Sequence, residues 1–300
     1  MKTLENIVKA VRRHLPFLGE EKPLVSVINL HGVISADETG RKGLSLKRME
    51  EVIEAAFKPS SLSAVALSIN SPGGSPVQSR LLFEEIRRHA KEKDVPVLAF
   101  IEDIGASGGY ILAIAGDEIY ADDSSIVGSI GVISGGFGFQ EAIARLGIER
   151  RVYTSGENKS TLDPFRQEDP ADIARLQKIL DELHKHFIAL VKERRGEKLP
   201  DGEKDLFSGA FWAGEQALEL GLIDGNARLN EFVRERFGKD VKVKRYAPGS
   251  GSLLKRLMSS RARSSELHSN GTMASSAGLV DPAELLATLE DRAMWARFGA

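Results

Sequence analysis

Residues 64–78 read AVALSINSPGGSPVQ and contain the three parts of a strand–turn–helix unit. The first six residues, 64–69, form a mostly apolar run that is typical of a buried strand, and a turn with the sequence NSPGG follows at 70–74. Ser75 can cap the helix, Pro76 suits its first position, and Gln78 completes a capping box. Because the backbone amides of such a turn point toward the helix N-terminus, the turn is a candidate anion or oxyanion site, although a Pro-Gly-Gly sequence alone is most often only a turn.

A second turn of this kind lies at residues 105–110, with the sequence GASGGY. It follows the next apolar run and places Ser107 between small residues at the start of a helix. A nucleophile at such a turn is exposed, and the amide of its neighbour is free to bind developing negative charge. Ser107 is therefore a candidate nucleophile.

Apolar runs alternate with helical segments from residue 24 onward, which is typical of α/β architecture. We expect strands at 24–30, 64–69, 97–101, 118–121, 151–154 and 241–246. We expect helices at 46–58, 76–93, 107–115, 139–146 and 171–195, with two shorter ones between 206 and 246. Gly196 should end the long helix.

Composition and charge exclude several classes of function. With 42% hydrophobic and 28% charged residues, the 300-residue chain can form one large or two small folded domains. Its 41 Lys and Arg residues against 43 Asp and Glu residues give no excess of positive charge, so we expect no nucleic-acid partner. The absence of cysteine excludes disulfides, thiolate metal sites and a cysteine nucleophile.

A serine nucleophile requires a base, and the sequence offers two kinds. The six histidines lie outside Gly-rich or turn contexts, so each is better explained as a surface or structural residue. The segment 155–165, SGENKSTLDPF, instead places Lys159 in a polar loop after an apolar run. An amine can act as general base where burial favours its neutral form, which makes Lys159 the candidate base.

Four blocks in this order resemble the signal peptide peptidase A family of Ser-Lys serine peptidases (SppA/SohB type). The blocks are SPGG at 71–74, ASGGY at 106–110, GSIGVI at 128–133 and GENK with DPF at 156–165. The resemblance covers roughly residues 24–246. It implies a ClpP/crotonase-like α/β fold, a superhelix of β-β-α units forming a single fold unit. It also implies a serine endopeptidase that uses no metal or cofactor and hydrolyses hydrophobic or unfolded peptides such as signal-peptide remnants.

The resemblance also implies roles for individual residues. Ser107 would be the acylating nucleophile and Lys159 its general base. Gly74, or alternatively Gly73, would supply one amide of the oxyanion hole, and Gly108 would supply the other. The expected chemistry is transfer of the serine proton to the neutral lysine, attack on a peptide carbonyl, and release of the acyl-enzyme by water.

The block after residue 128 is expected to orient the base and bind substrate. The resemblance implies that Ser129 holds the lysine amine through a hydrogen bond. The stretch 130–139 is uncharged and Gly-rich, which favours a rim to which an extended peptide adds as a strand. The candidate substrate-binding residues are Ile130, Gly131, Val132, Ile133 and Ser134.

The segments outside the expected peptidase domain, residues 23–247, have different compositions. Residues 1–22 form a basic amphipathic stretch that we expect to pack on protein, while residues 1–15 can also contact a membrane surface peripherally. No run reaches the ~18 apolar residues of a membrane span and no secretory core is present, so we expect a cytoplasmic protein, peripheral at most at the inner face of the membrane. Residues 248–281 are Ser/Gly-rich and predict a flexible linker, and residues 282–300 predict a terminal helix.

The single copy of the motif set has a consequence for assembly. Family members of double length contain two copies of the fold and, as the resemblance implies, take the lysine from one copy and the serine from the other. With one copy, the same geometry needs Lys159 of one protomer to meet Ser107 of the next, in a head-to-tail homo-oligomeric ring. Two alternatives remain open: a crotonase-like acyl-CoA enzyme that uses the oxyanion turn for an enolate, and a non-catalytic scaffold of the same fold.

Overall fold

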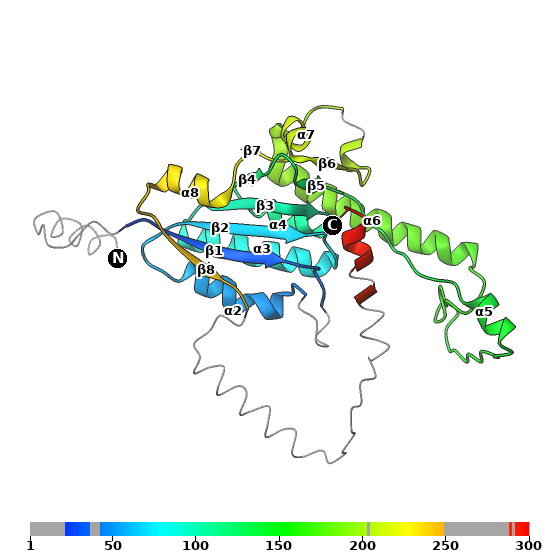
Figure 1. Cartoon of the computed structure of the whole chain (residues 1–300). Coiled ribbons are helices and arrows are strands. Elements are labelled where there is room, and N and C mark those ends of the chain that lie inside the picture. Colours follow the sequence, from blue (N-terminus) through cyan, green and yellow to red (C-terminus); the bar gives the residue numbers. More distant parts are fainter. Residues whose placement is uncertain (1–21, 37–42, 203–204, 249–287, 290–291, 300) are drawn as a thin grey trace, which may run out of the picture.

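The computed structural model describes residues 22–36, 43–202, 205–248, 288–289 and 292–299 (Figure 1). The strands are β1 (Leu24–His31), β2 (Leu62–Ser71), β3 (Val97–Ala106), β4 (Glu118–Ala121), β5 (Ile126–Gly128), β6 (Phe211–Ala213), β7 (Gly225–Asn226) and β8 (Lys242–Tyr246). The α-helices are α2 (Leu46–Phe57), α3 (Pro76–Lys93), α4 (Gly108–Ala113), α5 (Gln140–Arg145), α6 (Pro170–Arg195), α7 (Gly214–Glu219) and α8 (Leu229–Phe237). Two 3₁₀ turns, Gly196–Lys198 and Asp205–Phe207, follow α6.

The strands form one sheet in the order β6-β5-β3-β2-β1-β8, with β4 and β7 branching from β3. All pairs are parallel except β5 with β6. Because parallel strands need crossover connections, helices pack on the sheet faces, and ligand sites form where the carboxyl ends of the strands meet. Ser71 at the end of β2 pairs with Gly105 near the end of β3, so the two glycine turns leave the sheet side by side.

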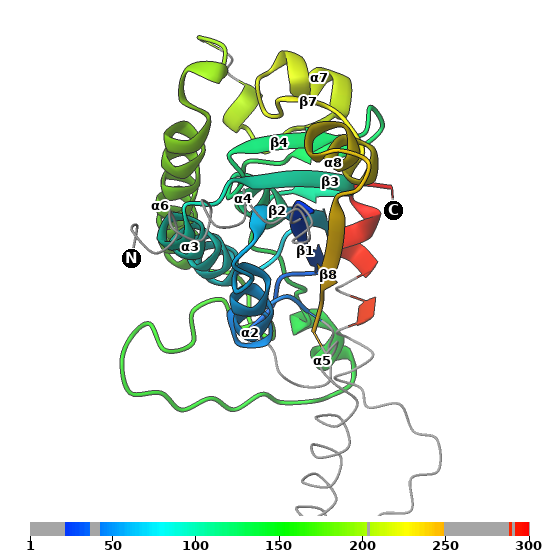
Figure 2. The same cartoon turned by 90° about the vertical axis from the view of Figure 1, so that its left-hand side faces the viewer.

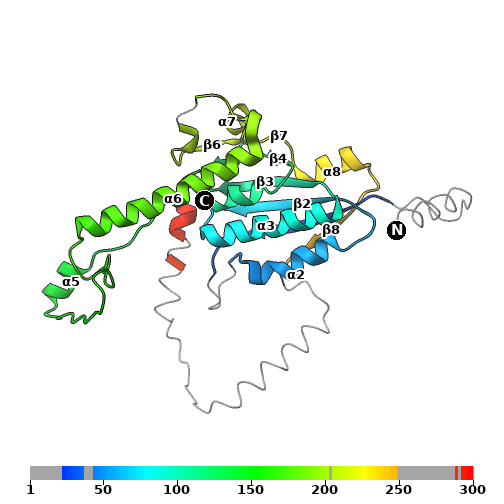
Figure 3. The same ribbon diagram turned by 180° about the vertical axis from the view of Figure 1, so that it is seen from behind.

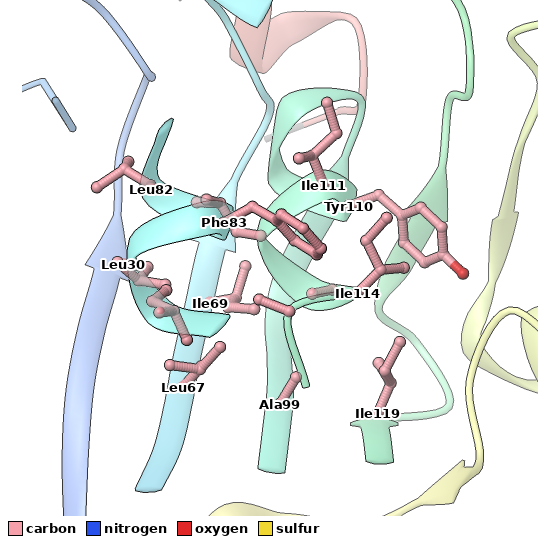
Figure 4. Packing of buried hydrophobic residues seen from close by; sticks show 14 of the residues in the cluster. Leu30, Leu67, Ile69, Leu82, Phe83, Ala99, Tyr110, Ile111, Ile114 and Ile119 are labelled. Carbon is pink, nitrogen blue, oxygen red and sulfur yellow. The ribbon is translucent and has the colours of Figure 1, made fainter. Parts of the chain in front are cut away.

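Alternating side chains give the sheet two separate cores. On one face, Leu67 and Ile69 of β2 pack with apolar residues of α2, α3, α4 and the C-terminal half of α6. On the other face, Ala64 and Ala66 pack with Val233 of α8. Figure 2 shows α2 and α3 on one side of the sheet and α8 on the other. Figure 4 shows the larger core, in which Ile111 and Ile114 contribute to the packing above the strands.

An arm projects from this body. Residues between β5 and α6, including α5, extend away from the sheet, and α6 runs back to it (Figures 1 and 3). The buried residues of α6 are Phe187, Val191 and Arg195, all in its C-terminal half. Arg195 donates to both carboxylate oxygens of Asp224 (2.8 and 3.1 Å), which anchors the end of α6 in the body. The N-terminal half of α6 contributes no buried residue, so it belongs to the arm.

Most of the predicted elements are confirmed, with bounds that differ by a few residues. The helix predicted at 76–93 is α3, and α6 ends at Gly196, whose φ of 45° suits a helix end. The strand predicted at 151–154 is wrong, because these residues are exposed on the arm and pair with none of the strands in the described part of the chain. The capping box is half right: Ser75 Oγ accepts from the Gln78 amide (3.4 Å), but Gln78 Oε1 accepts from the Leu46 amide (2.9 Å).

The segments predicted outside the peptidase domain are described only in small part. Residues 1–21, nearly all of the predicted N-terminal stretch 1–22, lie outside the described residues, as does the linker 248–281 apart from its first residue. Within the predicted terminal helix 282–300, residues 288–289 and 292–296 are helical. Among the described residues, no helix has both the length and the apolar character needed to cross a bilayer.

Candidate active site

Ser107 stands at the turn between β3 and α4. Its φ of 52° and ψ of −121° are unusual for a residue with a side chain, and such backbone strain persists only where the surroundings fix it. They do so here, because the Ser107 amide donates to the Gly128 carbonyl at the end of β5 (2.8 Å) and all six residues of α4 are buried. The side chain is partly exposed, and no described hydrogen bond engages its hydroxyl. The turn thus holds the Ser107 hydroxyl, which has no hydrogen-bond partner among the described residues, on a rigid backbone.

The first glycine turn lies directly against this serine. A Cβ built on Gly73 would fall 2.8 Å from the Ser107 Cβ and 2.8 Å from the Gly108 nitrogen. The Gly73 amide is already used, since it donates to the Ser71 Oγ (3.2 Å). The Gly74 amide donates to no acceptor in the part of the chain that the structure describes, and Gly108, as the first residue of α4, has an amide with no partner inside the helix. Gly74 and Gly108 are therefore the better pair of oxyanion donors, and Gly73 supplies the close approach.

Ser107 lines a cleft of about 450 Å³. Beside Ser107 and Gly108, its walls come from the first glycine turn, the start of α3, the segment 131–133 after β5, α6 and the segment 294–298. The apolar side chains that line it include Val77, Ile111, Val132, Ile133, Leu183, Phe187 and Leu190. Such a surface suits apolar side chains of a bound peptide.

Three of the five predicted substrate-binding residues line this cleft: Gly131, Val132 and Ile133. Ile130 does not, because its side chain is buried in the larger core and its carbonyl contacts His184 Nε2 (3.0 Å). Ser134 is exposed and lies outside the cleft lining. The predicted rim is therefore shorter than the sequence suggests.

Ser129 is held next to the nucleophile turn. It follows Gly128, whose carbonyl fixes Ser107, and its own amide donates to the Ala210 carbonyl (2.7 Å). The residue is nearly buried and has a φ of 52°. This position is compatible with holding a base brought to Ser107, but within one chain the lysine is elsewhere.

Lys159 lies on the arm and not in the cleft. It belongs to the segment between α5 and α6, which is found at the end of α6 remote from the sheet (Figures 1 and 3). The residue is exposed and does not line the Ser107 cleft. The structure therefore brings Ser107, Gly73, Gly74, Gly108 and Ser129 together, and it leaves Lys159 apart from them in a single chain.

The loop that carries Lys159 is fixed to the arm by Asp163. Both of its carboxylate oxygens accept from the Arg150 guanidinium (3.1 and 3.0 Å), and one also accepts from the Phe165 amide (3.0 Å). The hydrogen bond from the Phe165 amide, followed by that from Arg150, lowers the pKa of the Asp163 carboxyl. The Phe139 amide also donates to the Pro164 carbonyl (2.6 Å). The arm is a defined structure that holds the lysine loop in place.

The arm exposes apolar side chains that a soluble surface usually covers. The large exposed hydrophobic residues between β5 and the middle of α6 are Ile133, Phe137, Phe139, Leu146, Ile148, Val152, Tyr153, Ile173 and Ile179. In Tyr153 the exposed fraction reaches 90%. The apolar character of these residues is visible in the sequence. The short apolar run at 151–154 led to the wrong prediction of a buried strand there.

Sequence reasoning also missed part of the cleft. Leu183, Phe187 and Leu190 belong to the apolar stripe of the long helix, but periodicity alone does not tell which neighbour a stripe faces. Residues Met294, Arg297 and Phe298 line the cleft as well, and their sequence carries no signal of that position.

Comparisons with known proteins agree with this architecture. A solved structure described as "1510-N membrane-bound stomatin-specific protease" superposes with a TM-score of 0.50 and 17% identity, covering 76% of this chain and 100% of that chain. At this identity the match shows the fold alone, and it confirms the predicted ClpP/crotonase-like α/β class.

Two curated relatives extend the comparison. A Brucella abortus protein named "Na(+)/H(+) antiporter NhaA" is 47% identical over 284 residues, which cover 92% of this chain and 37% of that protein. The chain thus spans little more than a third of the length of this relative. A Haemophilus influenzae protein named "Probable protease SohB" is 28% identical over 217 residues, covering 72% of this chain and 59% of that protein.

The sequence model described as "Peptidase family S49" matches residues 89–244, just over half of the chain. The matched region includes the Ser107 turn, Ser129, the arm with Lys159 and the first three residues of β8. The chain therefore belongs to peptidase family S49.

Proposed function

We propose that the chain is a serine endopeptidase in which Ser107 forms an acyl-enzyme and Lys159 is the general base. One observation carries the proposal: a partly exposed serine lines an apolar cleft beside the amides of Gly74 and Gly108, and neither its hydroxyl nor these amides have a hydrogen-bond partner among the described residues. Two amides at this place can stabilise the negative charge that develops on a carbonyl oxygen during acyl transfer.

The chemical steps follow from these groups. The neutral lysine amine takes the Ser107 proton while Oγ attacks the peptide carbonyl, and the oxyanion accepts hydrogen bonds from Gly74 and Gly108. The C–N bond then breaks, and the leaving amine takes the proton back from the lysine. Water, deprotonated by the same lysine, attacks the ester, which releases the carboxylic acid product and restores Ser107.

The lysine in this scheme comes from a neighbouring protomer in a head-to-tail ring. Supporting this, Lys159 lies on the arm, away from the Ser107 cleft of its own chain. The helix that carries the arm has 26 residues and is about 39 Å long at about 1.5 Å per residue. The exposed apolar side chains of the arm supply a surface for the neighbour, and repetition of this contact closes a ring. Ser129 of the receiving protomer would then hold the incoming amine.

The substrates we propose are extended hydrophobic or unfolded peptides, such as signal-peptide remnants. The apolar cleft supports this class, and the segment Gly131 to Ile133 offers backbone for strand-like pairing. We place the protein in the cytoplasm, with residues 1–15 available for peripheral contact at the inner face of the membrane. The support for this location is the basic amphipathic sequence of those residues.

The test is the intact mass of the chain after reaction with a fluorophosphonate, a serine-directed acylating probe. We expect one adduct per chain for the wild type, none for Ser107→Ala, and a sharply slower reaction for Lys159→Ala. His186 provides the matched control, because it is a histidine that lines the same cleft. If His186→Ala abolishes the adduct and Lys159→Ala does not, the base is assigned wrongly.

The same probe, together with a CoA-thioester binding and activity assay, tests the two other interpretations of the fold. A non-catalytic scaffold forms no adduct in any variant. A crotonase-like acyl-CoA enzyme binds CoA thioesters and keeps its activity when Ser107 is replaced by alanine. Either result contradicts the peptidase proposal.

A further inference from the structure

One histidine of α6 holds the backbone beside the Ser107 cleft. His184 Nε2 lies 3.0 Å from the carbonyl oxygen of Ile130, 54 residues earlier in the chain. Because a carbonyl oxygen only accepts, Nε2 carries the proton and donates. The ring is partly buried, and its neighbours on the helix, Leu183 and Phe187, line the cleft. His184 itself is not among the residues that line the cleft, and the chemical steps above do not use it.

Hydrogen bonds within the protein fix the turn that contains Ile130. The Ser129 amide donates to the Ala210 carbonyl (2.7 Å), and the Gly131 amide donates back to the Ser129 carbonyl (2.9 Å). The Ile130 side chain is buried in the larger core. His184 supplies the partner for the carbonyl of Ile130. Of these three hydrogen bonds, only the one from His184 comes from a side chain.

The two residues after this turn have backbone groups that the turn does not use. Val132 and Ile133 line the cleft, and their amides and carbonyls take part in no hydrogen bond between described residues. Backbone groups left free at the wall of a cleft can pair with an extended peptide, which then adds as a strand. The direction of this segment therefore decides whether a peptide can pair with it and still present a peptide bond to Ser107.

We propose that His184 is a positioning residue for peptide substrates: its hydrogen bond to the Ile130 carbonyl fixes the direction in which residues 131–133 run along the cleft. The inference rests on the proposed function, since it assumes that peptides bind in this cleft. It gives a specific role to a histidine that the sequence indicates only as a surface or structural residue.

The peptide group between Ile130 and Gly131 is the part of the backbone that His184 controls. A peptide group is planar and almost always trans, so its carbonyl and its amide point in opposite directions. Here the carbonyl is held by His184 and the amide by the Ser129 carbonyl, so the plane is fixed at both ends. Without the histidine, only the amide end is held and the plane can tilt.

Gly131 makes this hold necessary. A Cβ at Gly131 would fall 2.9 Å from the Cα of Gly209, so the close approach of the two backbones requires glycine here. Glycine permits a wide range of backbone angles, so it does not by itself determine the direction of Val132 and Ile133. The peptide plane before it must be fixed from outside, and His184 is the side chain that does so.

The nucleophile and the helix do not depend on this hydrogen bond. The Ser107 amide donates to the Gly128 carbonyl (2.8 Å), which holds the nucleophile turn independently of α6. Phe187 and Val191 bury α6 in the body about one and two turns further along the helix. Loss of the donor at His184 should therefore weaken peptide binding and leave the reactivity of Ser107 unchanged.

The first experiment compares two side chains of similar shape, only one of which can donate. Glutamine and methionine are both unbranched and both form helices well, but only glutamine has N–H groups. In a Ser107→Ala background, the anisotropy of a fluorescein-labelled decapeptide of Leu, Ala and Val gives the dissociation constant. We expect His184→Met to raise this constant about tenfold, the scale of a lost hydrogen bond, and His184→Gln to keep it within about twofold.

Lys185→Met is the matched control for this comparison. Lys185 is the next residue of α6, its side chain is exposed, and it pairs with Glu182 on the same helix (2.8 Å). The same substitution at this neighbouring position should leave the dissociation constant unchanged. An unchanged constant for His184→Met, or equal weakening by His184→Met and His184→Gln, overturns the proposal.

The second experiment separates positioning from a general structural role. With Ser107 intact, the rate of labelling by a small fluorophosphonate reports on the nucleophile and its oxyanion donors, because this probe needs no strand pairing. Hydrolysis of the same decapeptide without its label gives kcat and KM. We expect His184→Met to be labelled at the wild-type rate and to raise KM about tenfold with kcat unchanged. Equal losses in labelling and in kcat/KM would show that His184 supports the whole site, which overturns the proposal.

Failure of the positioning role and failure of the peptidase proposal give different results. If the labelled peptide binds no variant and the fluorophosphonate labels no chain, the proposed function is wrong. If the wild-type chain is labelled at Ser107 and binds the peptide, but His184→Met binds it equally well, the peptidase stands and the positioning role is wrong.

Discussion

Gly73 and Ser107 are packed so closely that a methyl group on Gly73 would lie 2.8 Å from the Ser107 Cβ. The same methyl group would lie 2.8 Å from the Gly108 nitrogen, and Gly73 has a φ of +103°, which disfavours any side chain. The two turns that form the site therefore depend on each other for their positions.

The Gly73→Ala variant should lose acylation of Ser107 by about 100-fold or more, the usual cost of losing an oxyanion donor. The added methyl must displace either the serine or the Gly108 amide. Gly135→Ala is the control, because a Cβ at Gly135 meets no described atom within 4 Å. The measurement is the second-order rate of fluorophosphonate labelling, with circular dichroism to confirm folding. Wild-type labelling by a folded Gly73→Ala chain would show that the close approach has no catalytic role.

Mixing two inactive variants should restore activity if the site is completed between protomers. Ser107→Ala and Lys159→Ala chains are denatured, mixed in equal amounts and refolded, and peptide turnover is compared with refolded wild type. In randomly assembled rings about a quarter of the sites pair an intact lysine with an intact serine, so about a quarter of the activity returns. Each variant refolded alone is the control. A mixture that stays inactive would place both groups in one protomer.

The Tyr153→Asp variant should lower the oligomeric state and the labelling rate together. Tyr153 is 90% exposed on the arm, so its replacement in an isolated chain should change stability by only about 0.5 kcal/mol. A charge in an apolar contact between protomers is far more costly. Sedimentation velocity measures the assembly, and Leu218→Asp on α7, away from the arm, is the control. Unchanged assembly with Tyr153→Asp would exclude this part of the arm from the interface.

The Asp163→Asn variant should label more slowly at every pH without a change in the shape of the pH profile. The pKa of Asp163 is lowered, so its folded value lies below the unfolded value of about 3.9. Its contribution to arm stability is complete above that unfolded value and is lost only as the pH falls through the folded value. Asp163 is thus ionised throughout an assay above about pH 5. Asp181→Asn, an exposed carboxylate on α6, is the control. A shifted profile for Asp163→Asn would mean that Asp163 titrates with activity.

Sequence reasoning succeeded where each signal is local. The Ser75 cap and Pro76 mark the start of α3, and Gly196 marks the end of α6, because these residues act on the backbone within one turn. The signal for the turn that holds Ser107 is also local, because the glycines that flank the serine lie within a few residues of it. The candidate nucleophile and oxyanion glycines could therefore be named, and the structure places them together.

Sequence reasoning failed where the partner of a residue is distant. Gln78 accepts a hydrogen bond from Leu46, 32 residues earlier, and not from its own helix end. The apolar residues at 151–154 have the pattern of a buried strand, but their surroundings within one chain are solvent. Met294 and Phe298 line the same cleft as Ser107 although they are far from it in sequence, and an apolar stripe does not specify which surface it meets.

In the proposed ring, the length of α6 would set the distance between neighbouring protomers. Its C-terminal half is fixed in the body through Phe187, Val191 and the Arg195–Asp224 pair, and the opposite end carries the lysine loop. Each residue added to or removed from the exposed half shifts that loop by about 1.5 Å and turns it by about 100°. The spacing and rotation between successive protomers would then be encoded in one uninterrupted helix. Changes of two full turns, about seven residues, preserve the direction of the arm, whereas a change of two residues points the amine away from the neighbouring serine.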